Sequence, residues 1–92
     1  MNTIPANSSD LMLKITPNPV TSEITVYTNK NLSGNFNIQI IDAVGRLRIK
    51  RAVVARQKPI KLKINTDMLK GGLYYIVLSG QGENAKTSFI KY

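Results

Sequence analysis

The sequence predicts an all-β sandwich of seven strands, with one short helical turn near residues 66–69. Two observations lead to this fold class. Short segments alternate between apolar and polar residues, and clusters of Gly, Pro, Asn and Asp separate them, as in strands joined by turns. One segment, residues 71–78, reads Gly-Gly-Leu-Tyr-Tyr-Ile-Val-Leu and carries large uncharged residues on both faces of a strand. Such a run is typical of the middle of a sheet that is covered on both sides, or nearly so.

The first two strands are separated by a pair of prolines. We expect strands over 11–16 and 22–28, with Pro17, Asn18 and Pro19 between them. Each proline removes a backbone donor and fixes one φ angle, so the chain must leave one ladder and enter another in a set direction. Asn18 precedes a proline and is pushed toward extended geometry. This segment is therefore expected to be a rigid corner.

A hairpin turn follows the third strand. The remaining strands are expected over 36–41, 47–50 with an extension or bulge over 51–54, 60–64, 73–78 and 85–92, with loops at 29–35, 55–58 and 79–84. Asp42 can accept a hydrogen bond from the backbone two residues further on, and Gly45 stands where a left-handed residue closes the turn before a bulge. Asp42 and Arg46 are also placed to pair across this turn, an exposed contact that contributes about 0–1 kcal/mol.

Residues 65–70 break the two-residue period and predict a single helical turn. Asn65 or Thr66 can cap this turn, and Gly71 provides its left-handed exit. Met68 and Leu69 are expected to plug the end of the core.

The composition argues against catalysis and metal binding. A chain of 92 residues is enough for one domain. It contains no His and no Cys, so it lacks the commonest general base, the commonest metal ligand and any thiolate nucleophile. Its five acidic residues are spread singly along the chain. We therefore expect no enzyme activity, no cofactor and no metal.

The charge balance is strongly basic. Thirteen Lys and Arg residues against five acidic ones give a formal net charge of +8. Such a charge attracts anionic surfaces, but it also serves solubility without any partner. If their strands are neighbours, five outward residues would form one basic patch: Arg46, Arg48, Lys50, Lys61 and Lys63. Nucleic-acid binding is not expected, because no aromatic residues are interleaved with Lys and Arg.

The first ten residues differ from the rest of the chain. They are rich in Asn, Ser, Thr and Pro, show no periodicity, and lack the basic start and apolar core of a secretory signal. No apolar run in the chain reaches the ~20 residues that span a bilayer. We expect 1–10 to be a flexible linker and 11–92 to be the folded domain. The chain is then either cytoplasmic or a piece of a longer exported protein, and the polar, linker-like start fits the second case.

The order of three motifs resembles one protein family. The motif positions are Pro17, Asn18 and Pro19; Asp42, Gly45 and Arg46; and Gly72 and Tyr74. Together with a last strand that runs to Tyr92, they resemble the type A C-terminal sorting domain of the type IX secretion system, also called the Por secretion system. The resemblance implies a seven-stranded immunoglobulin-like sandwich that carries an attached N-terminal cargo protein through the periplasm to an outer-membrane translocon. Residues 1–10 would then be the flexible linker from this upstream cargo protein. It also implies that a cell-surface sortase-like peptidase normally removes the domain, which leaves the cargo at the cell surface or secreted.

In this family, residues near the end of the last strand matter for export. The matching positions here are Lys86, Phe89, Ile90 and Lys91. We expect the last strand, 85–92, to be a sheet edge to which a translocon component or shuttle protein adds a strand, and the same edge would allow weak self-association. The alternative is an immunoglobulin-like or fibronectin-like binding and adhesion module of a surface protein. Its candidate exposed rings would be Tyr27, Tyr75 and Tyr92.

Overall fold

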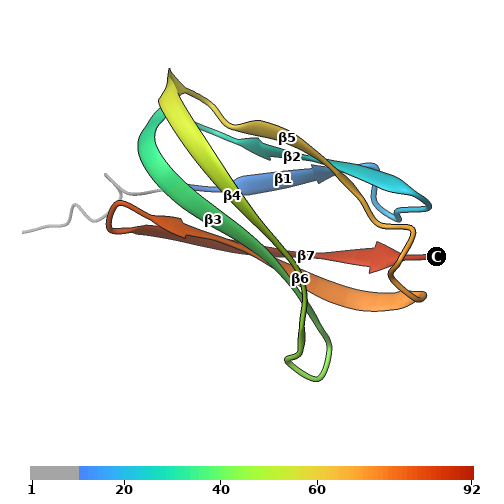
Figure 1. The fold of residues 1–92 in the computed structure, drawn as a ribbon. Helices are drawn as coiled ribbons and strands as arrows, with labels where there is room; N and C mark the ends of the chain where they lie inside the picture. The colour runs from blue at the N-terminus through green and yellow to red at the C-terminus, as the bar shows by residue number, and fades with distance from the viewer. Residues whose placement is uncertain (1–10) are drawn as a thin grey trace, which may run out of the picture.

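The computed structural model describes residues 11–92, which form seven strands and no helix. The strands are β1 (Leu13–Thr16), β2 (Glu23–Thr28), β3 (Leu32–Asp42), β4 (Leu47–Lys58), β5 (Lys61–Asn65), β6 (Gly72–Gly80) and β7 (Glu83–Lys91). They form two antiparallel sheets, one in the order β1-β2-β5 and one in the order β4-β3-β6-β7 (Figure 1). The predicted all-β, immunoglobulin-like sandwich is therefore confirmed. The expected linker over residues 1–10 lies outside the described residues.

The core lies between the two sheets. It is formed by inward side chains at alternate positions of the strands, most of which are buried. The largest fully buried apolar side chains are Phe36, Phe89, Ile24, Ile38, Ile40, Ile64, Ile76, Leu78, Val20 and Val26. Each such side chain stabilises the fold by about 1.5–3 kcal/mol relative to an exposed one. Within β2 and β3 the buried residues of this set alternate with less buried ones, because successive side chains of a strand point to opposite faces.

Strand β6 lies between β3 and β7, in the middle of the four-stranded sheet, as predicted. Its inward residues are buried, but its outward residues, Leu73, Tyr75 and Val77, are only partly covered. The sandwich has two layers, and no sheet of residues 11–92 forms a third. The expectation that β6 is covered on both faces is therefore confirmed for its inward face and wrong for its outward face.

Strands β3 and β4 extend furthest beyond their predicted bounds. Strand β3 begins at Leu32 instead of residue 36, and β4 continues to Lys58 through residues that were expected to form a loop. The Asn, Ser and Gly residues before Phe36 are typical of loops, but Leu32 is buried and pairs with Lys58 across the ladder. Cross-strand pairing and burial outweigh a weak local propensity for strand.

The helical turn expected between β5 and β6 is wrong. The connection is a single hydrogen-bonded turn in which the Leu69 N–H donates to the Thr66 carbonyl at 2.9 Å. The Asn65 side chain accepts the Asp67 N–H at 2.8 Å, as a cap would. Leu69 is buried as predicted, whereas Met68 is 66% exposed. One turn suffices because β5 and β6 belong to different sheets and the connection only crosses the end of the core.

Candidate functional site

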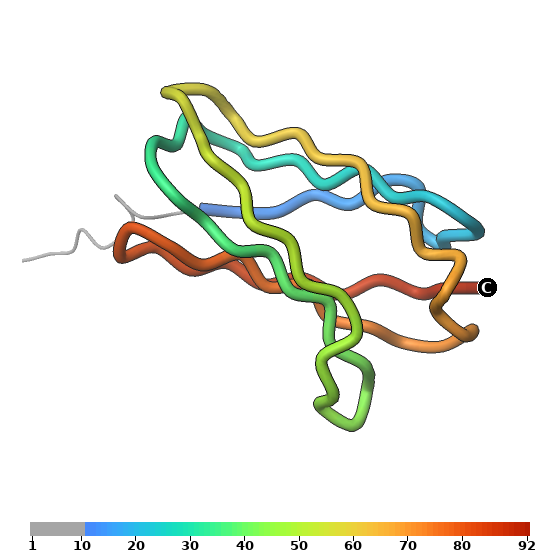
Figure 2. The backbone as a smooth tube through the Cα atoms, viewed as in Figure 1, coloured from blue at the N-terminus to red at the C-terminus, as the bar shows by residue number. Residues whose placement is uncertain are grey.

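The three sequence motifs meet at one end of the sandwich, which we call the motif end. It consists of the connections 17–22, 42–46 and 66–71 and the last residues of β7. In Figure 2 the cyan and orange connections lie beside the marked C-terminus. Along the ladders Asp42 is opposite Tyr74, and Tyr74 is opposite Phe89. Gly72 is opposite Lys91, so the order across this end is hairpin turn, start of β6, end of β7 and proline corner.

The proline corner holds the outer edge of β7. Oδ1 of Asn18 accepts a hydrogen bond from the Ile90 N–H at 3.0 Å. The Val20 N–H donates to the Ile90 carbonyl at 2.7 Å, and the Tyr92 N–H donates to the Val20 carbonyl at 2.8 Å. The Val20 side chain is fully buried and anchors the corner in the core. The corner therefore occupies the last edge positions of β7 with the protein's own chain.

Only part of the β7 edge is open. Among residues 11–92, β6 is the one strand that pairs with β7, so β7 lies at a sheet edge. Alternate residues of a strand direct their main-chain groups to the same side, so those of Lys86 and Ser88 face the same way as those of Ile90. No main-chain hydrogen bond from residues 11–92 reaches them there. We call the main chain of residues 86–88 the free edge.

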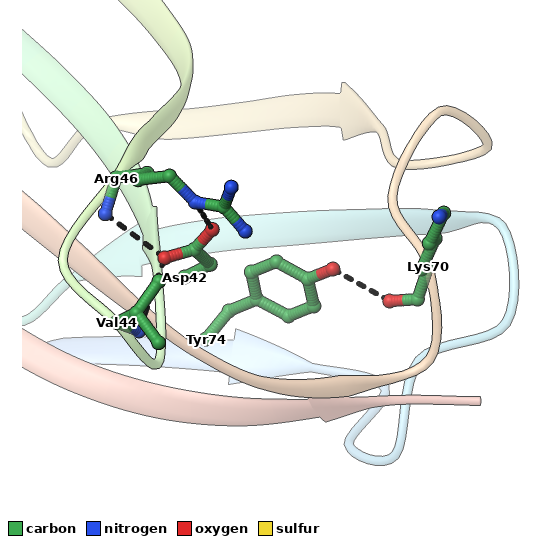
Figure 3. A network of polar contacts seen from close by, with 5 residues as sticks. All are labelled: Asp42, Val44, Arg46, Lys70 and Tyr74. Carbon is green, nitrogen blue, oxygen red and sulfur yellow. Dashed lines mark hydrogen bonds and ion pairs between the residues drawn. The ribbon is translucent and has the colours of Figure 1, made fainter.

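The hairpin turn is held by one carboxylate (Figure 3). Oδ1 of Asp42 accepts hydrogen bonds from the N–H groups of Val44, at 3.1 Å, and Arg46, at 2.9 Å. Oδ2 accepts one from Arg46 Nε at 3.0 Å. Gly45, with a φ of 91°, donates to the Asp42 carbonyl and closes the turn in the left-handed conformation predicted for it. The Arg46 N–H, followed by the guanidinium and the Val44 N–H, holds the pKa of Asp42 below its usual value, because all of them favour the charged carboxylate.

Tyr74 connects three segments of the motif end. Its hydroxyl donates to the Lys70 carbonyl at 2.6 Å, which ties the connection before β6 to the strand itself (Figure 3). Its ring stacks on Phe89 of β7, with centroids 5.6 Å apart and planes 19° from parallel. Gly72, with a φ of 153°, begins the strand opposite Lys91. Tyr74 and Gly72 thus set the position of β7 within the sheet.

The four expected recognition residues of β7 divide between its two faces. Lys86 and Ile90 point outward, and Ile90 is 41% exposed. Phe89 and Lys91 point into the sandwich and are 1% and 7% exposed. Lys91 Nζ lies 3.4 Å from the main-chain oxygen of Tyr92. A partner that binds the folded domain can therefore touch the first two side chains, but the other two are accessible only if β7 leaves the sheet.

The single basic patch considered from the sequence does not form. Arg48 and Lys50 lie on β4 of the four-stranded sheet, whereas Lys61 and Lys63 lie on β5 of the three-stranded sheet. Because these strands are not neighbours, the basic residues divide between the two sheets. Sequence alternation gave the outward direction of these side chains but could not assign each strand to a sheet.

Val20 was missed by the sequence reasoning. Its main chain pairs with β7 and its side chain is fully buried. The available signal was a single apolar residue directly after Pro19 in an otherwise polar connection. Within residues 11–92 there is no group of three acidic, His or Cys residues able to hold a metal ion. The same part of the chain contains no helix long and apolar enough to cross a membrane.

The chain matches a known protein family. The model of the secretion system C-terminal sorting domain matches residues 14–92, which is nearly the whole described chain. A search among curated proteins found no match. The match does not favour the alternative of an immunoglobulin-like adhesion module. The chain therefore belongs to the family of secretion system C-terminal sorting domains, and it is a type IX sorting signal that works with the secretion machinery while attached to a protein bound for the cell surface or the medium.

Proposed function

We propose that the secretion machinery recognises this domain in its folded state, through the free edge of β7. The observation that carries the proposal is the division of that edge. Its end is paired with the proline corner, whereas the main-chain groups of Lys86 and Ser88 have no partner in residues 11–92. Unpaired main-chain groups at a sheet edge are a ready template for a strand of another protein.

The proline corner has a supporting role in this proposal. By pairing with Ile90 and Tyr92 it keeps the end of β7 in the sheet, so the free edge is presented in one register. A preorganised edge binds more tightly than a frayed one, because less conformational entropy is lost on binding. The sorting motifs then act by fixing the geometry of β7 and not through reactive groups.

The route of the attached cargo follows from this mode of recognition. The domain would travel through the periplasm, pair with an outer-membrane translocon or shuttle protein, and be removed at the cell surface by a sortase-like peptidase. The cut would fall before Leu11, within residues 1–10, which lie outside the described residues. The domain itself would catalyse no step, since it is the cargo-bearing substrate of the peptidase.

A substitution at Ser88 tests the free edge. Proline in place of Ser88 removes the outward N–H but leaves the ladder to β6 intact, because the main chain of Ser88 faces away from β6. Ser88→Ala retains the N–H and is the matched control. A secreted reporter fused in front of residues 1–92 should be exported about tenfold less with Ser88→Pro and normally with Ser88→Ala.

Circular dichroism and a melting curve of each purified domain separate recognition from folding. Export of a folded Ser88→Pro variant at the wild-type level would overturn the proposal.

A further inference from the structure

The outer face of the four-stranded sheet carries a cluster of apolar side chains that the fold does not cover. We call it the outer-face patch, and it consists of Ile41, Leu47, Leu73, Tyr75, Val77 and Ile90. Leu47, Leu73 and Ile90 are 52%, 38% and 41% exposed. A contiguous apolar cluster that is left exposed and bounded by polar residues marks an interaction site.

The strand register makes the patch contiguous. Leu47, Ile41 and Tyr75 are successive cross-strand partners, and cross-strand partners share a face. Leu73 and Ile90 form the next pair, closer to the motif end. Toward the other end of the sheet the corresponding row is small and polar, with Ala52, Asn37, Ser79 and Asn84. The patch is therefore limited to the half of the outer face that adjoins the motif end.

Within residues 11–92, the outer face of the other sheet carries no such cluster. The outer face of the three-stranded sheet presents Lys14, Tyr27 and Lys61 in one row, and Thr16, Thr25 and Lys63 in the next. An exposed sheet face of this polar kind is the usual arrangement in an antiparallel sandwich. The apolar outer face of β6 thus departs from a pattern that the same chain follows elsewhere.

The border of the patch is basic. One row crosses all four strands from Lys50 through Gln39 and Val77 to Lys86, so a lysine stands at each edge of the sheet. Lys86 Nζ lies 4.8 Å from the centroid of the Tyr75 ring. At the motif end the patch adjoins a cleft of about 360 Å³ whose lining includes Leu73, three basic residues, Arg46, Arg48 and Lys70, and one acidic residue, Asp42.

On the sheet face, no Asp or Glu side chain of residues 11–92 pairs with Lys50 or Lys86. Glu23 lies on β2, and Asp67 lies in the connection before β6. Asp42 is paired with Arg46, and Glu83 is paired with Lys30. Two copies of the patch facing each other would bring lysine against lysine, so self-association is disfavoured. The charge selects a partner that supplies carboxylates.

We propose that the outer-face patch is a docking surface for a protein of the secretion machinery whose own contact surface is apolar at its centre and bordered by Asp and Glu. The inference rests on the proposed function, because a strand added at the free edge would extend the sheet and lie directly beside Lys86 and Ser88. The same partner would then cover the patch. An apolar centre with a polar border is the usual anatomy of a protein–protein interface.

Two pairs of charge reversals test the docking surface. Lys50→Glu with Lys86→Glu reverses the border of the patch, and Lys61→Glu with Lys63→Glu is the matched control on the opposite face. Each pair changes the net charge equally and includes a lysine over a tyrosine ring, at 4.8 Å for Lys86 and 5.8 Å for Lys61. In the reporter fusion with residues 1–92, the first pair should lower export about tenfold, and the second should leave it unchanged.

Site-specific photo-crosslinking in secreting cells identifies the occupant. A photoreactive phenylalanine analogue is placed at Leu47 in the patch or, as a control, at Tyr27 on the opposite face. The inference predicts an adduct from Leu47 alone, to a secretion component with an acidic contact peptide, and predicts its loss with the Lys50 and Lys86 reversals. An adduct to a second copy, an adduct to lipopolysaccharide, or no adduct at Leu47 would each overturn it.

The outcomes separate this inference from the proposed function. If Ser88→Pro blocks export while the Lys50 and Lys86 reversals do not, the docking surface is wrong and edge recognition stands. If the reversals block export of a folded domain while Ser88→Pro does not, edge recognition is wrong and the patch stands.

Discussion

The two ends of the sandwich are closed in different ways. At the end opposite the motifs, formed by the connections 29–31, 59–60 and 81–82, close packing around Gly80 adds to polar contacts such as the ion pair of Lys30 and Glu83. A Cβ at Gly80 would overlap the Asn35 carbonyl and the Phe36 side chain. At the motif end, polar groups join segments that are far apart in sequence, such as Asn18 and Ile90, which are 72 residues apart. We therefore expect the opposite end to serve the fold, and the motif end to position the strand that, in our proposal, the machinery reads.

The largest expected effect is at the opposite end. Gly80→Ala forces a Cβ into the Asn35 carbonyl at a φ of 151°, which should destabilise the domain by about 2–4 kcal/mol. Gly82→Ala is the control, because Gly82 has a φ of 75° but open space around it, so only the backbone strain of about 1 kcal/mol remains. Urea unfolding of both variants measures the difference. Equal losses of unfolding free energy in the two variants would show that close packing around Gly80 does not stabilise this end.

A smaller effect is expected at the proline corner. Asn18→Ala removes the acceptor for the Ile90 N–H, at a cost of about 0.5–1.5 kcal/mol. Amide exchange should become faster at Ile90, while Phe89, whose main chain faces β6, should stay protected. Asn18→Asp keeps an oxygen acceptor and should retain most of the protection. Unchanged amide exchange at Ile90 in Asn18→Ala would show that the Asn18 side chain does not hold the end of β7.

The smallest effect concerns the hairpin turn and depends on pH. The hydrogen bonds from Arg46 and Val44 lower the pKa of Asp42, so this group stabilises the fold above the pKa of the unfolded chain, about 4. That contribution is lost as the pH falls through the lower pKa of the folded state. As the pH is lowered from 7, the melting temperature should therefore fall more steeply for the wild type than for Asp42→Asn. An equal fall of the melting temperature in both proteins would contradict the role of the carboxylate.

Sequence reasoning recovered the features that depend on residues close together in the chain. Alternation gave the seven strands, and the residues around Asp42 and Gly45 gave the hairpin turn. It failed where long-range pairing decides, as at Leu32, whose burial depends on its partner strand. It likewise could not foresee that Asn18 would bind Ile90, because nothing in the proline corner indicates which strand lies beside it.

The two ends also differ in what they should contribute to export. The central claim is that the machinery reads β7 as the motif end holds it, and not merely a stable domain. Asn18→Ala and Gly82→Ala are suited to testing it, since each is expected to cost about 1 kcal/mol, at opposite ends of the fold.

The decisive measurement is the fraction of a reporter fused to residues 1–92 that reaches the cell surface or medium, compared between these two variants at equal stability. We predict wild-type export for Gly82→Ala and about fivefold less for Asn18→Ala. An equal fall in both variants, or no fall in either, would contradict the claim.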